Sequence, residues 1–219
     1  MHVTDSHTSD GIPGAEVIVV DVPNGNTTLV KELTNAEGDH RSLIKDVSIK
    51  DSLVYRVKLN RTGYYPKKGL FLYVVPDSGE IAMHHEMDIS MDPIVVGADA
   101  GKSLELSPIR FATGKWDILP EAAAELDKVV ELMKENPRMV VELRGHTDSR
   151  GSAIANRTLS TRRSQSAAEY IIGSGIFADR LRSRGYGEGS LLNNCGDGVK
   201  CTDEEHAANR RTEFIVIEL

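Results

Sequence analysis

The sequence predicts a multidomain chain with an all-β sandwich at its N-terminus and an α+β domain at its C-terminus, in which helices cover one face of a mixed sheet. Before about residue 94, short β-branched runs alternate with turn signals and show no helical periodicity. After that point, two segments with helical periodicity lie next to strand-like runs. The length of 219 residues, with 40% apolar residues, suits one or two compact domains.

The N-terminal part is expected to consist of short strands joined by turns. Residues 1–9 are expected to be disordered, and the sandwich is expected to span 10–94. Its strands are predicted from β-branched or alternating runs bounded by turn residues such as those of Pro-Asn-Gly-Asn. The expected strands cover 15–22, 27–34, 52–60, 69–76 and 79–91.

The C-terminal part begins after an expected linker at 95–103 and spans 104–219. A helix is predicted over 119–137, because Pro120 suits a first turn and Pro137 ends the pattern. One stripe of that helix is apolar and is expected to face the core: Leu126, Val129, Val130 and Met133. A second helix is expected over 152–172. The expected strands cover 104–112, 138–145, 180–188 and 209–219.

Charge and hydropathy exclude several classes of protein. The formal net charge is −7, whereas a nucleic-acid-binding protein normally carries a basic surplus. No run of about 18 apolar residues exists, so no transmembrane segment is expected. The first residues lack a basic region followed by an apolar run, which argues against a signal peptide. The chain is therefore expected to be cytoplasmic, or to be a mature or excised piece of a larger exported protein.

Two cysteines, Cys195 and Cys201, are separated by five residues that include Gly-Asp-Gly. Such a turn brings the two side chains together, and the pattern favours a disulfide because one cysteine pair alone does not supply four metal ligands. A disulfide implies an oxidising compartment. The neighbours His84 and His85 would point to opposite faces of a strand, so we expect neither a bound metal nor a cofactor.

Polar residues concentrate in GHTDSRGSAIANRTLSTRRS, where a strand is expected to pass into a helix. Asp148 lies in the loop between the two elements. Asn156, Leu159 and Arg163 follow at helical spacing and share one face, on which Leu159 would reach the core. Arg162 points about 100 degrees away from that face.

Three interpretations of this stretch compete on the residues alone. Asp148 could cap the helix beside a solvated arginine face. Asp148 and His146 could perform acid–base chemistry, although no second carboxylate or nucleophile lies nearby in sequence. A fixed carboxylate and a fixed guanidinium could instead bind a ligand with an amine and a carboxylate, because the planar guanidinium can bond both carboxylate oxygens.

Four short motifs lie between residues 10 and 92: Gly14-Ala15-x-Val17, Thr34-x-x-x-Gly38, Tyr55-x-Val57 and Gly63-Tyr64. In these motifs, residues 10 to 92 resemble the transthyretin-like regulatory domain of carboxypeptidases. The resemblance implies an Ig-like sandwich that acts as a spacer or interaction module without catalytic residues. His40 departs from the family, which usually has an aromatic residue there.

The second part of the chain contains a series of short segments: Gly145-His146-Thr147-Asp148-x-x-Gly151, Asn156, Leu159-Ser160, Arg163, Gly185-Tyr186-Gly187-Glu188 and Asn209-Arg210-Arg211. In these segments, residues 104 to 219 resemble OmpA-like peptidoglycan-binding domains, because the segments occur in family order and at family spacing. The resemblance favours the binding interpretation and implies a non-catalytic protein.

The resemblance also implies residue roles in recognition of the peptidoglycan stem peptide. Asp148 would bind the ammonium and Arg163 the carboxylate at the zwitterionic end of diaminopimelate. Other positions would line or support this site: Asn156, Leu159, Thr147, Arg211, Phe111 and Thr113. The family often has an acidic or aromatic residue after the first-strand phenylalanine, where this chain has Ala112-Thr113-Gly114. The alternatives are an assembly module whose wall-binding site has decayed, and a cell-wall hydrolase.

The domain order is similar to that at the C-terminal end of large periplasmic lipoproteins, including those of type IX secretion. This similarity implies a periplasmic, outer-membrane-associated protein of the Gram-negative envelope. Its expected partners are the diaminopimelate-containing stem peptide and secretion-system or outer-membrane proteins.

Overall fold

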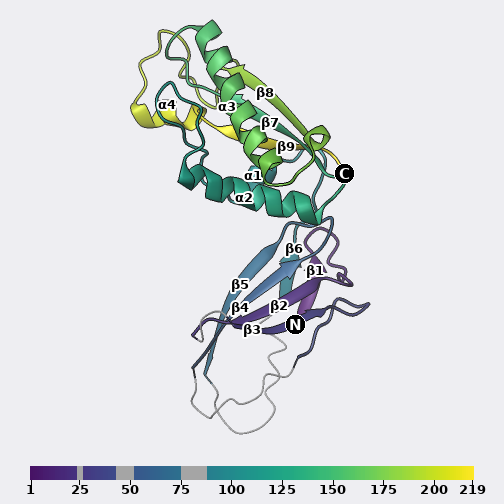
Figure 1. Cartoon of the computed structure of the whole chain (residues 1–219). Coiled ribbons are helices and arrows are strands. Elements are labelled where there is room, and N and C mark those ends of the chain that lie inside the picture. The colour runs from purple at the N-terminus through teal and green to yellow at the C-terminus, as the bar shows by residue number, and fades with distance from the viewer. Residues whose placement is uncertain (24–26, 43–51, 75–87) are drawn as a thin grey trace. The chain divides into compact units, whose positions relative to one another are not determined.

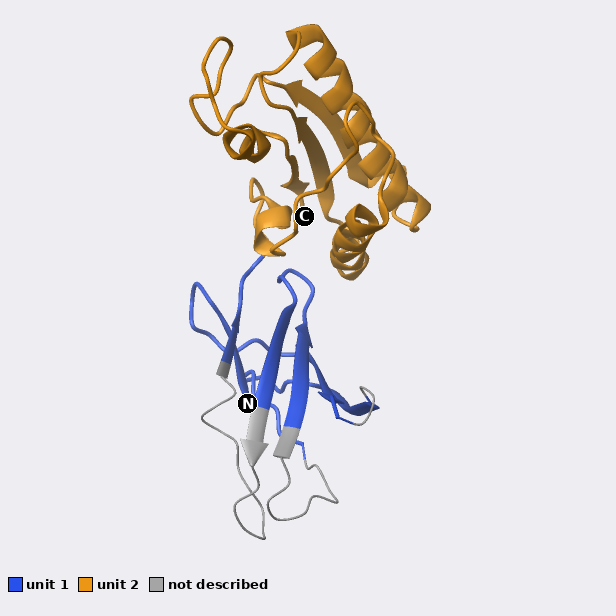
Figure 2. Ribbon diagram, turned by 90° about the vertical axis from the view of Figure 1, so that its left-hand side faces the viewer, with its two compact units in different colours: residues 1–93 blue, residues 94–219 orange. Residues whose placement is uncertain are grey.

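The computed structural model describes residues 1–23, 27–42, 52–74 and 88–219. The chain forms two compact units, Met1–Pro93 and Ile94–Leu219, which Figure 2 shows in separate colours. Each unit is described by itself below.

In the described residues of the first unit, the regular secondary structure consists of β-strands. A four-stranded antiparallel sheet has the order β3-β2-β4-β5, and a second, parallel pair joins β1 to β6 (Figure 1). The buried core consists of Val3, Ile12, Ala15, Val17, Val19, Val30, Tyr55, Val57, Leu59 and Met91. The strands are β1 His2–Asp5, β2 Glu16–Asp21, β3 Thr27–Leu33, β4 Ser52–Asn60, β5 Lys67–Val74 and β6 Asp88–Met91. The transthyretin-like resemblance itself remains a prediction.

The expected disorder at residues 1–9 is wrong for β1. Val3 is completely buried, and its backbone exchanges hydrogen bonds with Gly38 and Ile12 at 2.9 and 2.8 Å. A four-residue strand with one buried side chain is too short to produce a periodic signal, which is why the sequence pattern missed it. The strand expected at 79–91 corresponds to β6 over its last four residues, and its residues 79–87 lie outside the described ranges.

The second unit contains a three-stranded mixed sheet of order β8-β7-β9, in which β7 is parallel to β8 and antiparallel to β9. The predicted helices and the last three predicted strands are present, and the apolar stripe of α2 is buried as expected. The elements are α1 Ala100–Ser103, α2 Pro120–Glu135, β7 Val140–His146, α3 Ala153–Gly173, η1 Ala178–Arg180, β8 Leu181–Gly187, α4 Asp203–Asn209 and β9 Thr212–Glu218.

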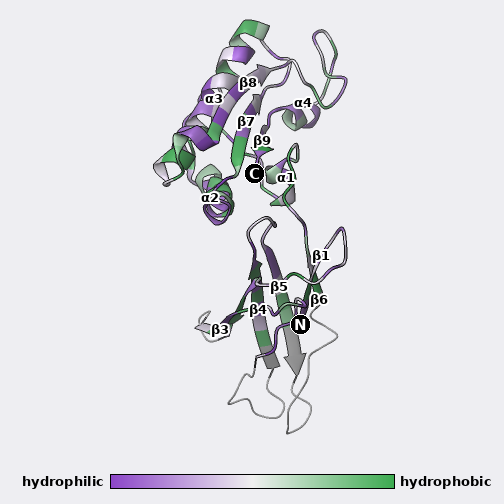
Figure 3. Ribbon diagram, turned by 90° about the vertical axis from the view of Figure 1, so that its right-hand side faces the viewer, coloured by the Kyte–Doolittle hydropathy of each residue, from purple (hydrophilic) through white to green (hydrophobic). Residues whose placement is uncertain are grey.

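Helix α3 runs along β7 and β8 (Figure 1) and packs closely on them through small residues. Ser160 and Ser164 are completely buried there. A Cβ on Gly145 would lie 2.4 Å from the Ser160 carbonyl oxygen, and a Cβ on Gly185 would lie 2.3 Å from the Thr161 nitrogen. The interface therefore requires glycine on the strands, which explains how a helix with long hydrophilic stretches packs on a sheet (Figure 3).

Two expectations about residues 95–112 are wrong. The expected linker contributes to the second unit, because Asp99 caps α1 and forms a bridge to Ile215 of β9. The expected strand at 104–112 is not formed; residues 106–112 have neither helix nor strand. Pro108 lacks the N–H that a strand in that position would donate. None of the helices that the structure describes is both long enough and apolar enough to cross a membrane.

Candidate binding site

The loop between β7 and α3 is built by its own polar side chains. Ser152 caps α3 by accepting a hydrogen bond from the Ala155 nitrogen at 3.3 Å. Gly151 adopts a φ of 105°, which disfavours any residue with a side chain. The Asn156 amide reaches back from the first turn of α3 to the carbonyl oxygens of Asp148 and Arg150 at 3.2 and 3.3 Å. The loop residues and the first turn of α3 thus fix the loop conformation together.

Asp148, on this loop, forms what we call the acidic end of the site. Its Oδ2 accepts hydrogen bonds from Arg210 at 2.6 Å and from the Arg150 side chain at 3.0 and 3.2 Å. Its Oδ1 accepts one from the Arg150 backbone at 3.2 Å. Burial raises the pKa of this carboxyl, but the bonds from Arg210 and Arg150 outweigh burial and lower the pKa overall. Asp148 is therefore a charged acceptor over the physiological pH range.

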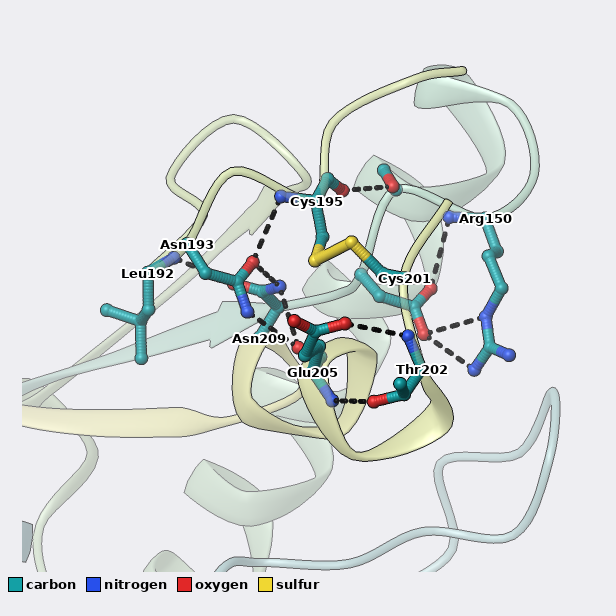
Figure 4. Close-up of a disulfide and its surroundings, with 10 residues drawn as sticks. Arg150, Leu192, Asn193, Cys195, Cys201, Thr202, Glu205 and Asn209 are labelled. Carbon is teal, nitrogen blue, oxygen red and sulfur yellow. Dashed lines mark hydrogen bonds and ion pairs between the residues drawn. A yellow bond between two sulfur atoms is a disulfide. The ribbon is translucent and has the colours of Figure 1, made fainter. Parts of the chain in front are cut away.

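A disulfide loop contacts the loop between β7 and α3 next to the acidic end. Cys195 and Cys201 form the predicted disulfide, and the Ser149 hydroxyl donates to the Cys195 carbonyl oxygen. Directly after Cys201, Thr202 and Glu205 form a capping box that starts α4 (Figure 4). The first residue of α4, Asp203, accepts from Arg150 at 2.8 Å.

Arg163, in the middle of α3, forms the basic end. Its Nε donates to the Lys115 carbonyl oxygen at 3.0 Å, and its Nη2 donates to the Ala112 carbonyl oxygen at 3.3 Å. The guanidinium carbon lies 5.0 Å from the centre of the Phe111 ring. Within the described part of the chain, no carboxylate lies at ion-pairing distance from this guanidinium.

The two ends lie within electrostatic reach of each other. Burial lowers the pKa of Arg163, the positive charge of Arg210 lowers it further, and the negative charge of Asp148 acts in the opposite direction. Three arginines, Arg150, Arg163 and Arg210, thus share the site with two aspartates, Asp148 and Asp203. These three arginines and two aspartates together carry one surplus positive charge, which suits a ligand with at least one negative group.

The other predicted site residues differ in their burial and contacts. Asn156 is buried and shapes the loop, and its amide also donates to Glu188. Thr147 is 3% exposed, and in the described residues its hydroxyl has no hydrogen-bond partner. Phe111 contacts Arg163, while Thr113 is exposed between the two residues whose carbonyls hold that arginine. These positions agree with a lining role, which remains a prediction.

Two expectations about supporting residues need correction. Leu159 is only partly buried, and Ser160 and Ser164 occupy the core-facing positions. The glycines of the strands let α3 approach the sheet closely, so only small side chains of α3 fit between them. Arg211 bonds Glu213 at 2.8 Å and the Ser190 carbonyl oxygen at 3.2 Å. The arginine that reaches Asp148 is its neighbour Arg210.

His146, the histidine of the alternative acid–base interpretation, is not directed at Asp148. Its ring stacks on Tyr186 at 5.2 Å, and its Nε2 lies 3.4 Å from Glu213 without hydrogen-bond geometry. Burial, followed by the charge of Arg211, lowers the pKa of His146.

Sequence reasoning missed Arg150 and Arg210 as partners of Asp148. Arg210 belongs to the Asn209-Arg210-Arg211 segment, and a choice between its two arginines requires knowing where the preceding helix ends. α4 ends at Asn209, so Arg210 lies at the C-cap of that helix and Arg211 leads into β9. Arg150 lies two residues after Asp148, a spacing at which a loop side chain can return to a carboxylate.

Comparison with known proteins places part of the second unit in a family. Residues 110–204, less than half of the chain, match the model of the OmpA family. Outer membrane protein P5 of Haemophilus influenzae is 34% identical over 130 residues, which are 57% of this chain and 37% of that protein. The peptidoglycan-binding protein ArfA of Mycobacterium tuberculosis is 29% identical over 109 residues, which are 50% of this chain and 32% of that protein.

A solved structure of a putative MotB-like protein from Desulfovibrio vulgaris is 30% identical, covers 51% of this chain and 68% of its own, and has a TM-score of 0.44. The chain spans less than half the length of the two curated relatives above. Residues 110–204 are therefore an OmpA-like domain. Relatives that are outer-membrane proteins and a lipoprotein agree with the expected periplasmic, outer-membrane-associated location.

Proposed function

We propose that the second unit binds peptidoglycan without cleaving it, by gripping the zwitterionic end of diaminopimelate in the stem peptide. Asp148 binds the ammonium group and Arg163 binds the carboxylate. The protein thereby anchors a periplasmic or outer-membrane-associated assembly to the cell wall. The similarity to a relative described as a peptidoglycan-binding protein supports this proposal.

The observation that carries the proposal is the uncompensated charge of Arg163. A partly buried guanidinium normally lies beside a carboxylate, because burial without a partner destabilises the charge. Here main-chain oxygens hold Nε and Nη2, and the third nitrogen, Nη1, takes part in neither bond. A ligand carboxylate would supply the missing negative charge, in an orientation that the two carbonyl bonds already fix.

The arrangement of the acidic groups supports a binding role over hydrolysis. A general acid needs a pKa near the working pH, whereas Arg210 and Arg150 keep the pKa of Asp148 low. His146 stacks on Tyr186 and is therefore not available as the partner of Asp148. We accordingly assign the site to non-covalent recognition. A role in type IX secretion rests on domain order alone and remains a further prediction.

The test is co-sedimentation of the protein with purified peptidoglycan sacculi that contain diaminopimelate. We expect the parent protein to sediment with the sacculi and Arg163→Met to remain in the supernatant. The matched control is Arg184→Met, which removes an exposed arginine from β8. Equal sedimentation of the parent and Arg163→Met would contradict the proposal. New soluble muropeptides in the supernatant would instead support the hydrolase alternative.

A further inference from the structure

The Oδ2 oxygen of Asp148 is already saturated before any ligand arrives. It accepts three hydrogen bonds from the side chains of Arg210 and Arg150, and only 9% of the Asp148 side chain is exposed. An incoming ammonium group can therefore bind this oxygen only if one of these cations releases it.

The two arginines differ in how easily they can move. The Arg210 side chain is 37% exposed, and its bond to Asp148 is short at 2.6 Å. The Arg150 side chain is 52% exposed, its bonds to Asp148 are longer at 3.0 and 3.2 Å, and its Nη1 already bonds Asp203. Asp203 is 85% exposed at the start of α4 and can accept further hydrogen bonds. Arg150 can thus leave Asp148 and keep a carboxylate partner.

We propose that Arg150 is a resident counter-ion, which occupies the ammonium position on Asp148 in the free protein and transfers to Asp203 when the ligand amine binds. This inference rests on the proposed function and adds to it a residue that sets specificity. The exchange leaves Asp148 with the same number of cations before and after binding. The Arg150 side chain is half exposed and has a second carboxylate partner in Asp203, so a ligand amine can displace it from Asp148.

The exchange also explains how the site would select its ligand. A ligand that offers only a carboxylate can reach Arg163 but leaves Arg150 on Asp148. A ligand that offers both groups gains the bond to Asp148, because its ammonium takes the place that Arg150 vacates. Arg150 therefore increases the selectivity of the site for ligands that carry an amine close to their carboxylate.

Two substitutions separate this role from a merely structural one, because they act in opposite directions on affinity. Arg150→Ala removes the competitor and should tighten binding by about two- to five-fold, because the half-exposed Arg150 side chain competes only weakly for Asp148. Asp203→Asn removes the negative charge of the second acceptor, favours Arg150 on Asp148 and should weaken binding by about two-fold. The Arg150 backbone bond to Asp148 does not depend on the side chain, so the loop should keep its conformation in both variants.

The measurement is isothermal titration calorimetry with the tripeptide L-alanyl-γ-D-glutamyl-meso-diaminopimelate. The matched controls are Arg184→Ala, which removes another exposed arginine, and Glu204→Gln, which removes a neighbouring exposed acid of α4. Neither control should change the affinity. Arg150→Lys keeps a positive charge without the planar fork, so its affinity should lie between those of the parent and Arg150→Ala.

The outcomes distinguish this inference from the proposed function. If the parent binds the tripeptide and Arg163→Met does not, the proposed function holds; unchanged or weaker binding by Arg150→Ala would then overturn the counter-ion role alone. If Arg150→Ala binds more tightly and Asp203→Asn more weakly, the counter-ion role is supported. If the parent does not bind the tripeptide, both proposals fail together.

Discussion

The two ends of the candidate site are held by different kinds of contact. At the basic end, main-chain carbonyls of residues 112 and 115 orient Arg163, and no described carboxylate neutralises it. At the acidic end, side-chain cations neutralise Asp148, and these cations are themselves partly exposed. The guanidinium of Arg163 therefore has a fixed orientation but no neutralising carboxylate. The carboxylate of Asp148, by contrast, is neutralised by arginine side chains that can move. We expect the two ends to respond differently to substitution.

The largest expected effect concerns the frame that positions the basic end. Gly185→Ala would place a Cβ 2.3 Å from the Thr161 backbone and force α3 away from the sheet. Overpacking of this kind should lower the free energy of unfolding by about 3 kcal/mol. Thermal denaturation measures the change. Gly173→Ala, at the end of the same helix, is the control, because no atom lies within 4 Å of its added Cβ; an equal loss in both variants would contradict the packing explanation.

The next effect concerns the support of the acidic end. Replacing both Cys195 and Cys201 by serine opens a short loop and should cost about 2 kcal/mol of unfolding free energy. The loop carries the carbonyl that accepts from Ser149 and leads directly into α4. Affinity for the tripeptide should fall, since both Asp203 and Arg210 depend on the placement of α4. Calorimetric titration of the variant checks this, and unchanged affinity would show that α4 is placed without the disulfide.

A pair of charge substitutions compares the two ends directly. Asp148→Asn should lower the free energy of unfolding by about 1 kcal/mol, because Arg210 and Arg150 lose their shared carboxylate. Arg163→Met should leave stability unchanged or raise it, because it removes a partly buried charge without a described carboxylate partner. Both should abolish binding. Chemical denaturation measures the difference, and a larger loss for Arg163→Met would reverse our account of the two ends.

The last expected effect is a pH dependence that arises outside both ends. The pKa of His146 is lowered in the folded protein, so its contribution to stability is complete above the unfolded pKa of about 6.5. As the pH falls from about 6.5 through the folded pKa, that contribution is lost, at no more than about 1.4 kcal/mol per pH unit. His146→Phe should keep the stacking on Tyr186 and remove this slope. A slope that persists in the variant would assign it to another group.

Most of the frame could be predicted from the sequence because its signals are local. The apolar stripe of α2 and the residues that start α2 and α3 lie within one or two turns of the elements they define. The wrong expectations concern segments that depend on distant partners. β1 exists because Val3 is buried against other segments of the first unit, and α1 is held by its bridge to β9. No periodic pattern within a few residues records such contacts.

The sequence also predicts Asp148 and Arg163 as the charged ends of the candidate site, but it does not predict their partners. Asp148 and Arg163 are linked by the loop and helix between them, so spacing and family motifs identify them. Arg210 is 62 residues from Asp148 and reaches it only because α4 ends beside the loop. The small residues on the inner face of α3 were missed for a related reason. Their burial depends on Gly145 and Gly185 of the facing strands, which sequence periodicity on α3 cannot show.

The measurement that tests the central claim most directly compares two stem peptides that differ in one carboxylate. Calorimetry with the diaminopimelate tripeptide and with its lysine counterpart isolates the group that we assign to Arg163, because lysine keeps the ammonium and lacks the neighbouring carboxylate. We predict that the lysine peptide binds at least about ten-fold more weakly, the usual cost of leaving one charged hydrogen-bonding partner unmatched. Equal affinity for the two peptides would contradict the zwitterion model.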